Sequence, residues 1–144
     1  MNLPDLDSFL SPRSIAIVGA STNPNKVGAV ALRYLLEQGY RGEVYPINAG
    51  TQRIEGCRPH PSLRAVGKPI DLAIFAIPAS GADAALDDAI GAQVRNIVMF
   101  SAGFAELGTQ GAAVQRQFVD RARAAGIRVL GPNCLGFMNV AQSV

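Results

Sequence analysis

The chain alternates short apolar runs with longer stretches in which apolar residues recur at helical spacing. The runs are rich in β-branched residues and are nearly continuous in hydrophobicity, as in Ile15–Val18 and Leu72–Ile77. Such runs are typical of strands that are buried on both faces. The pattern predicts five strands, at residues 14–19, 43–48, 71–77, 96–101 and 127–131.

Three helices are predicted between these strands. The first places five apolar residues on one face and is followed by a glycine that can end it: Val27, Val30, Ala31, Tyr34 and Leu35, then Gly39. The second follows residues 79–81 and continues to about Ile90, and the third runs from near Thr109 to Ala125, with Val114, Phe118 and Ala122 facing inward. Residues 53–66 are expected to be irregular, with one helical turn near residues 61–65.

Strands that alternate with helices are the signature of a parallel sheet covered on both faces. We therefore expect an α/β fold, a Rossmann-like, doubly wound and mostly parallel sheet of about five strands. The 144 residues, 49% of them hydrophobic, suffice for one core, so residues 1–144 are interpreted as a single domain.

The charges indicate neither a nucleic-acid nor a membrane partner. The 13 basic and 11 acidic residues give a formal net charge of +2, and the basic residues are scattered singly. No apolar run approaches the roughly 20 residues that span a bilayer. The N-terminal Met1–Asp5 shows no basic region followed by an apolar stretch, so we expect a cytoplasmic protein.

Metal and nucleophile chemistry have little support. Cys57 and Cys134 are the two cysteines and His60 is the single histidine, which gives no zinc cluster and no disulfide framework. Cys134 lies in a tight turn without a candidate base, so packing is its expected role. His60 lies between two prolines, which is typical of a surface loop. We predict no metal site and no catalytic residue within this chain.

Candidate binding residues follow the predicted strands, because ligands of open parallel sheets bind beyond the carboxyl ends of the strands. These turns are small, polar or glycine-rich, which leaves room for a ligand and exposes backbone N–H groups. Turns between strands and helices are commonly of this composition, which accounts for part of the pattern. The turns are Gly19-Ala20-Ser21, Asn48-Ala49-Gly50, Ile77-Pro78-Ala79, Ser101-Ala102-Gly103 and Gly131-Pro132-Asn133-Cys134.

The first turn is the most informative. From residue 19 to 28 it reads Gly-Ala-Ser-Thr-Asn-Pro-Asn-Lys-Val-Gly, which matches neither the G-x-G-x-x-G dinucleotide motif nor the P-loop. Ser21 and Thr22 offer hydroxyl groups, and Lys26 offers a cation at the helix entry. Gly28 would let a phosphate or its ester approach the backbone closely.

Three residues qualify this picture. Asn48 stands where an NAD-binding enzyme would present Asp or Glu to the ribose, which disfavours NAD. Lys26 could instead be a solvated residue of the first helical turn. Glu106 is either a functional residue or a surface residue ahead of the third helix.

Six segments in this order resemble the coenzyme A-binding domain of NDP-forming acyl-CoA synthetases. That family includes ADP-forming acetyl-CoA synthetase and, more distantly, the α subunit of succinyl-CoA synthetase. The resemblance covers roughly residues 6–139. The segments are residues 11–21 (SPRSIAIVGAS), 26–28 (KVG), 44–48 (VYPIN), 71–74 (DLAI), 101–106 (SAGFAE) and 131–136 (GPNCLG).

The resemblance implies that CoA, a substrate of the parent enzyme, lies across the strand ends. It places the nucleotide part of CoA in the first loop, at Ser21, Thr22, Lys26, Val27 and Gly28. It places the path towards the reactive end along Ile77, Pro78, Phe100, Ser101 and Ala102, with Asn133 near that end. Gly19, Ala20 and Asn48 complete the candidate CoA-binding set.

One departure affects this set. Relatives commonly have Asn-Pro and then a basic or polar residue after the second strand, whereas this chain has Asn48-Ala49-Gly50-Thr51. A charged contact to the CoA phosphates is therefore not expected here unless Arg53 provides it.

The resemblance also implies a larger enzyme. Family members continue past the equivalent of residue 144 into a domain with a phosphorylated histidine and into an ATP-grasp domain. We expect CoA or acyl-CoA and the remaining ligase domains, or an ATP-grasp subunit, as partners, and the chain could also form a homo-oligomer. The parent reaction would join an acid to CoA with conversion of ATP to ADP and phosphate; the acyl group and the choice between ADP and GDP stay open.

Functions other than that of a ligase domain are also compatible with the sequence, to different degrees. The chain could be a stand-alone CoA-binding protein or the regulatory CoA-binding domain of a protein lysine acetyltransferase. An NAD-dependent dehydrogenase ranks third, because of Asn48 and the spacing of the first loop.

Overall fold

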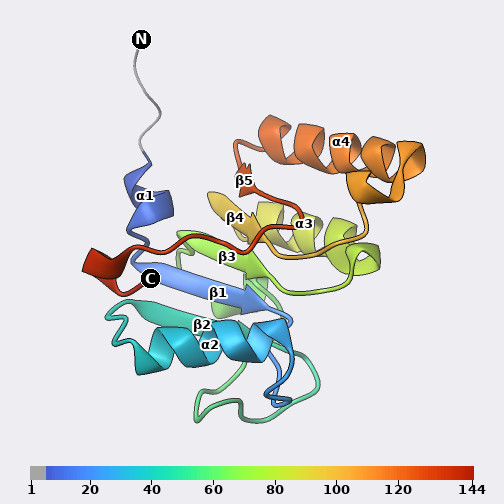
Figure 1. Ribbon diagram of the computed structural model, residues 1–144. Helices are drawn as coiled ribbons and strands as arrows, with labels where there is room; N and C mark the ends of the chain where they lie inside the picture. Colours follow the sequence, from blue (N-terminus) through green and yellow to red (C-terminus); the bar gives the residue numbers. More distant parts are fainter. Residues whose placement is uncertain (1–5) are drawn as a thin grey trace.

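Five parallel strands form one sheet in the order β2-β1-β3-β4-β5 in the computed structural model, which describes residues 6–144 (Figure 1). Met1–Asp5, on which the expectation about targeting segments depends, lie outside the described residues. The strands are β1 (Ser14–Val18), β2 (Glu43–Ile47), β3 (Leu72–Phe75), β4 (Asn96–Met99) and β5 (Arg128–Leu130). The predicted fold class and all five predicted strands are confirmed; each predicted run extends by one or more residues into the turn that follows the strand.

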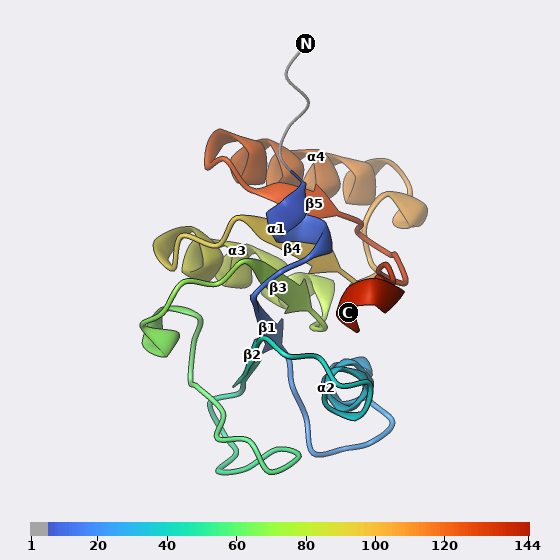
Figure 2. The same ribbon diagram turned by 90° about the vertical axis from the view of Figure 1, so that its left-hand side faces the viewer.

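Helices cover both faces of the sheet. Helix α2 lies on one face together with the C-terminal segment, and α3 lies on the other face (Figure 2). The helices are α1 (Asp7–Leu10), α2 (Val27–Glu37), α3 (Ala82–Gly91) and α4 (Thr109–Ala124), with short 3-10 turns η1 (Arg64–Val66), η2 (Ala79–Gly81), η3 (Ala105–Leu107) and η4 (Val140–Gln142). The three predicted helices are present, and α1 and the turns η2, η3 and η4 are additional. None of the helices described in residues 6–144 has the length and apolar character to cross a membrane.

Alternate residues of each central strand enter two separate apolar layers. Ile17 of β1 is opposite Ile74 of β3, which in turn is opposite Val98 of β4, and this row packs against the α2 face. Their neighbours Ala73 and Ile97 enter the layer beneath α3 and α4. Both layers are buried, which is why the strands read as continuous apolar runs instead of alternating ones.

Three predicted core positions are wrong: Val114 of α4, and Val27 and Tyr34 of α2. Val114, expected to face inward, is 42% exposed, whereas Phe118 and Ala122 are buried as predicted. Gly111 of α4 packs against the Phe104 backbone, so the buried stripe runs through residues 111, 118 and 122; at 100° per residue Val114 lies about 60° from it. Tyr34 of α2 is 59% exposed, because it borders a groove that the C-terminal segment covers only in part.

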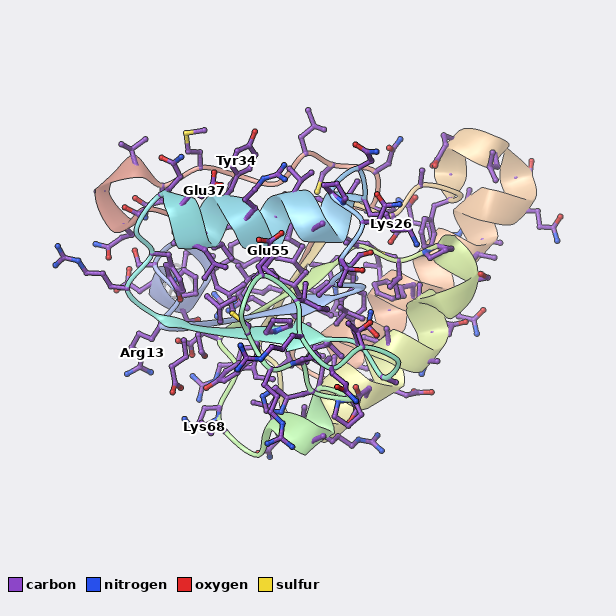
Figure 3. The ribbon with its side chains drawn as sticks, turned by 90° about the horizontal axis from the view of Figure 1, so that it is seen from below. Arg13, Lys26, Tyr34, Glu37, Glu55 and Lys68 are labelled. Carbon is purple, nitrogen blue, oxygen red and sulfur yellow. The ribbon has the colours of Figure 1, made fainter. Side chains whose placement is uncertain are left out.

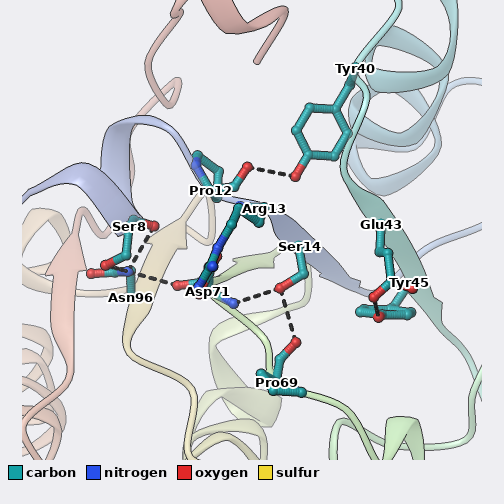
Figure 4. Close-up of polar contacts among 10 residues, drawn as sticks. All are labelled: Ser8, Pro12, Arg13, Ser14, Tyr40, Glu43, Tyr45, Pro69, Asp71 and Asn96. Carbon is teal, nitrogen blue, oxygen red and sulfur yellow. Dashed lines mark hydrogen bonds and ion pairs between the residues drawn. The ribbon is translucent and has the colours of Figure 1, made fainter.

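Polar side chains join the starts of the strands at the amino edge of the sheet (Figure 4). The Ser14 hydroxyl donates to the Pro69 carbonyl oxygen at 3.0 Å and accepts the Asp71 N–H at 2.9 Å. The Asn96 side-chain amide donates to the Asp71 carbonyl oxygen at 2.7 Å and to the Ser8 carbonyl oxygen at 3.1 Å. These bonds satisfy backbone groups where the ladders begin and align β1, β3 and β4.

Candidate functional site

The strand order reverses direction between β1 and β3, which are neighbours in the sheet although β2 separates them in sequence. In sheets of this order, ligands bind beyond the carboxyl ends of the strands at the reversal point. Gly19, directly after β1, has φ +90°, and a Cβ built on it would lie 2.4 Å from the Ala76 carbonyl oxygen after β3. The two turns that flank the reversal point are therefore in direct backbone contact, and only glycine fits there.

Helix α2 begins at this point without a side-chain cap. Its N-cap residue is Lys26, and no side chain accepts a hydrogen bond from the first turn of the helix. The Lys26 side chain is exposed at the N-terminal end of α2, far from Arg13 and Lys68 on the opposite side of the molecule (Figure 3). Uncapped N–H groups and a nearby ammonium group favour an anion.

The loop before α2 has its own local hydrogen bonds. The Ser21 hydroxyl accepts the Asn23 N–H at 3.1 Å, and the Asn23 side chain accepts the Asn25 N–H at 3.0 Å. Thr22 is exposed, and Val27 is 54% exposed at the start of the helix. The loop is thus shaped by side-chain-to-backbone bonds that place Thr22, Lys26 and Val27 at the surface.

Gly28 has a packing role that the sequence interpretation missed. It is buried, and a Cβ built on it would lie 2.2 Å from the Gly19 carbonyl oxygen. Its missing side chain therefore lets the first turn of α2 lie against the turn after β1. The spacing of Gly19 and Gly28 was visible in the sequence, but their contact is tertiary, and a ligand contact at Gly28 stays a prediction.

Asn48 connects the turns after β1 and β2. Its side-chain amide donates to the carbonyl oxygen of the buried Ala20 at 2.8 Å, and its Oδ1 accepts the Gly50 N–H at 2.8 Å. Both ends of the side chain are therefore engaged with the backbone. An acidic residue at this position could not donate to Ala20, so the bond gives a structural reason for asparagine.

Ser101 connects three other turns. It is 6% exposed, and its hydroxyl donates to the Ile77 carbonyl oxygen at 2.5 Å. Its own carbonyl oxygen accepts the N–H of Asn133, which has φ +51°, at 2.9 Å. Ile77 and Phe100 are half-buried, whereas Pro78, Ala102 and Asn133 are exposed. The structure therefore brings the predicted path residues to one edge, with Ser101 as the buried link between them.

Glu106 holds the turn after β4. The Gly103 N–H donates to the Glu106 carboxylate at 2.5 Å. Hydrogen bonds from the backbone, foremost that of Gly103, lower the pKa of Glu106 from its usual value. The capping-type spacing of the glycine and the glutamate, three residues apart, was the available sequence signal for this contact.

His60 has a structural position. Its N–H donates to the Pro46 carbonyl oxygen at 2.8 Å, and its carbonyl oxygen accepts the Asn48 N–H at 2.9 Å, so it extends the ladder beside β2. The half-buried ring packs edge-on against Tyr45 at a centroid distance of 5.8 Å. Residues 53–66, expected as irregular with one helical turn, contain η1 at Arg64–Val66.

Two cavities lie away from the predicted CoA-binding residues, of which Phe100 alone lines either cavity. One, of about 860 Å³, is at the amino edge and includes Arg13, Arg64, Lys68 and Arg95 in its lining. The other, of about 730 Å³, is an apolar groove between α2 and residues 135–144, and Phe100 lines it. The predicted CoA-binding residues instead lie on the turns at the carboxyl edge of the sheet, where some are buried and others exposed.

Comparisons with known proteins agree with this geometry. A family model described as a CoA-binding domain matches residues 13–140. The α subunits of acetate–CoA ligases (ADP-forming) II and I from Pyrococcus furiosus are 36% and 35% identical to this chain over 135 residues each, covering 93% and 91% of it. The chain spans 29% of the length of each of these relatives.

Solved structures show the same relationship. A dinucleotide-forming acetyl-coenzyme A synthetase from Ca. Korarchaeum cryptofilum, in complex with phosphate and ADP, superposes with a TM-score of 0.94 at 34% identity, over 99% of this chain and 30% of that one. A Thermus thermophilus protein superposes with a TM-score of 0.71 at 25% identity, over 94% of both chains. The chain therefore belongs to the family of CoA-binding domains and matches part of the α subunits of ADP-forming acetyl-CoA synthetases.

Proposed function

We propose that CoA or acyl-CoA binds across the carboxyl edge of the sheet, with its phosphates at the turn after β1. The uncapped start of α2 beside the exposed Lys26 carries this proposal. Backbone N–H groups and an ammonium group are complementary to phosphate. The full set of proposed contacts is Gly19, Ala20, Ser21, Thr22, Lys26, Val27, Gly28, Asn48, Ile77, Pro78, Phe100, Ser101, Ala102 and Asn133.

Not all of these residues offer a free polar side chain. The hydroxyl of Ser101 and the amide of Asn48 are already bonded to the backbone. Both residues would therefore shape the surface or contribute backbone atoms, while Lys26, Thr22 and Asn133 present exposed side chains to the ligand. The pantetheine part would run from the first turn past Pro78 towards Asn133.

The parent activity is proposed to be that of an NDP-forming acyl-CoA ligase, which converts an acid, CoA and ATP into acyl-CoA, ADP and phosphate. The names of the Pyrococcus relatives support this assignment. Because this chain corresponds to 29% of their length, other domains or a subunit would supply the nucleotide chemistry and the phosphohistidine. A cytoplasmic location and self-association stay predictions.

The alternative is a stand-alone CoA-binding protein or a regulatory domain. The Thermus protein, which this chain covers over 94% of its length, shows that the fold exists in a chain of similar size. The TM-score of 0.94 with the Korarchaeum synthetase, against 0.71 with that small protein, favours the ligase lineage.

Calorimetric titration of the purified chain with CoA, acetyl-CoA and NAD tests the proposal. We expect CoA and acetyl-CoA to bind more tightly than NAD, because Asn48 supplies no acceptor pair for the ribose hydroxyls. Equal or tighter binding of NAD would contradict the proposed function.

A further inference from the structure

Glu106 lies in an exposed 3-10 turn, yet its carboxylate is directed back at the backbone of the turn after β4. The Gly103 N–H is 2.5 Å from Glu106 Oε1. The backbone N–H groups of Gly103, foremost, and of Glu106 and Phe104 lower the pKa of the Glu106 carboxyl. The carboxylate thus occupies the Gly103 N–H, a backbone donor that would otherwise be open to an anion.

The turn has other anchors, so its course does not depend on Glu106 alone. Phe104 is completely buried, and its ring packs on Phe118 at a centroid distance of 6.3 Å. The Ala105 N–H donates to the side chain of Gln115 at 3.2 Å. A Cβ built on Gly103 would lie 3.0 Å from the Ala79 side chain, so the turn lies against the turn after β3. Removal of the Glu106 carboxylate should therefore free the donors without unfolding the turn.

The turn after β1 has the opposite character. Residues 19–28 contain Lys26 and no acidic residue, and α2 starts there without a side-chain cap. β1 and β4 are separated by β3, so their ends are two strand spacings apart, about 10 Å. An anionic ligand along this edge therefore meets open N–H donors and the Lys26 ammonium group at the turn after β1. At the turn after β4 it meets an occupied donor and the negative charge of Glu106.

We propose that Glu106 is a positioning residue, an internal anion that occupies the backbone donors after β4 and excludes phosphate from that turn. The phosphates of CoA then have one place to bind, the turn after β1, and the pantetheine part is directed over the turn after β4. The statement about CoA rests on the proposed function. The exclusion of phosphate from the Gly103 turn does not.

Titration of the ¹⁵N-labelled chain with inorganic phosphate tests the exclusion directly. In the wild-type chain the Gly103 amide resonance should not move, whereas in Glu106→Ala it should move saturably with phosphate. Glu37→Gln, which changes an exposed glutamate of α2, is the matched control and should behave as the wild type. Equal movement of Gly103 in the wild type and Glu106→Ala, or none in Glu106→Ala, overturns the proposal.

A second variant covers the case in which Glu106→Ala disturbs the fold. Glu106→Gln keeps an oxygen acceptor of the same reach and removes the charge, so the Gly103 resonance should move, by less than in Glu106→Ala. Its complete insensitivity to phosphate would overturn the proposal. A parallel CoA titration separates the two hypotheses. If the wild-type chain binds no CoA, the proposed function alone is contradicted. If it binds CoA but phosphate does not move the Gly103 resonance in the Glu106 variants, only the positioning role is contradicted.

Discussion

The side-chain amide of Asn48 donates a hydrogen bond to the Ala20 carbonyl oxygen at 2.8 Å, and this bond joins two turns that are 28 residues apart in sequence. Ala20 is 1% exposed, so water cannot easily replace the donor. The bond therefore holds the turn after β2 against the turn after β1, where the CoA phosphates are proposed to bind.

Asn48→Ala should lower the free energy of unfolding by about 1–3 kcal/mol, because it leaves a buried carbonyl oxygen without its donor. Urea denaturation measures the change, and Asn25→Ala, at an exposed position of the neighbouring loop, should be close to neutral. Asn48→Asp should destabilise the chain as well, because a carboxylate cannot donate to Ala20, and it should confer no NAD binding, because the first loop still lacks the G-x-G-x-x-G motif. NAD binding by that variant would show that the acid alone decides the cofactor.

Gly28→Val should lower the free energy of unfolding more than the CoA affinity, because the Cβ of the valine would lie 2.2 Å from the Gly19 carbonyl oxygen. Overpacking of this kind costs about 1–3 kcal/mol. The matched control is Gly50→Ala, whose Cβ would meet only the Asn48 Oδ1, at 3.7 Å. Thermal unfolding and calorimetry on the same samples separate stability from affinity; an unchanged unfolding temperature with a lost CoA affinity would return Gly28 to direct ligand contact.

Lys26→Ala should weaken CoA binding by about 1–3 kcal/mol, the range for a charge-assisted hydrogen bond to phosphate. The free energy of unfolding of this variant should equal that of the wild type, since the Lys26 side chain is exposed. Arg41→Ala, also exposed and placed beyond the C-terminal end of α2, is the control for a general loss of positive charge. The affinity of the wild type, but not that of Lys26→Ala, should fall clearly as salt is raised. Equal salt dependence in both proteins would make Lys26 a solvated residue.

The raised pKa of Tyr40 predicts that the chain loses stability at alkaline pH. Burial, and secondarily the negative charge of Asp71, raises the pKa of Tyr40 from 10.0 to about 12. The folded chain therefore retains this proton where the unfolded chain releases it. The stabilisation is fully present below pH 10 and is lost as the pH rises from about 10 to about 12.

Urea unfolding at a series of alkaline pH values measures this loss. Tyr40→Phe, which also removes the hydroxyl bond to the Pro12 carbonyl oxygen, should reduce the loss in that window without abolishing it, because the pKa of Tyr45 is also raised to about 12. An equally steep loss in the variant would assign the effect to other groups.

The chain by itself should neither form nor cleave a thioester. Transfer of phosphate through a histidine requires an imidazole that meets both a nucleotide and an acyl phosphate. His60 extends the ladder beside β2 and packs on Tyr45, a structural position. Incubation with ATP, magnesium, acetate and CoA should yield no acetyl-CoA and no acid-labile phosphoprotein. Either product, if it disappears in His60→Ala, would reveal an enzyme in this chain.

The sequence by itself determined the strands, the main helices and the set of turns that carry the candidate site. Apolar periodicity is a local property, and the continuous runs in β1 and β3 signal burial on both faces without knowledge of the neighbours. The wrong positions, Val27, Tyr34 and Val114, are ones where exposure depends on which neighbouring element is present.

Only the tertiary structure decided what the site residues do. Gly28 packs on Gly19, Asn48 bonds to Ala20, and Ser101 bonds to Ile77, across separations of 9, 28 and 24 residues. The partners of Asn48 and Ser101 cannot be deduced from a residue and its neighbours, because they depend on the strand order, which places β2 beside β1 and β4 beside β3. A polar side chain after a strand is equally compatible with a ligand contact and with a backbone bond until that order brings the backbone group within reach.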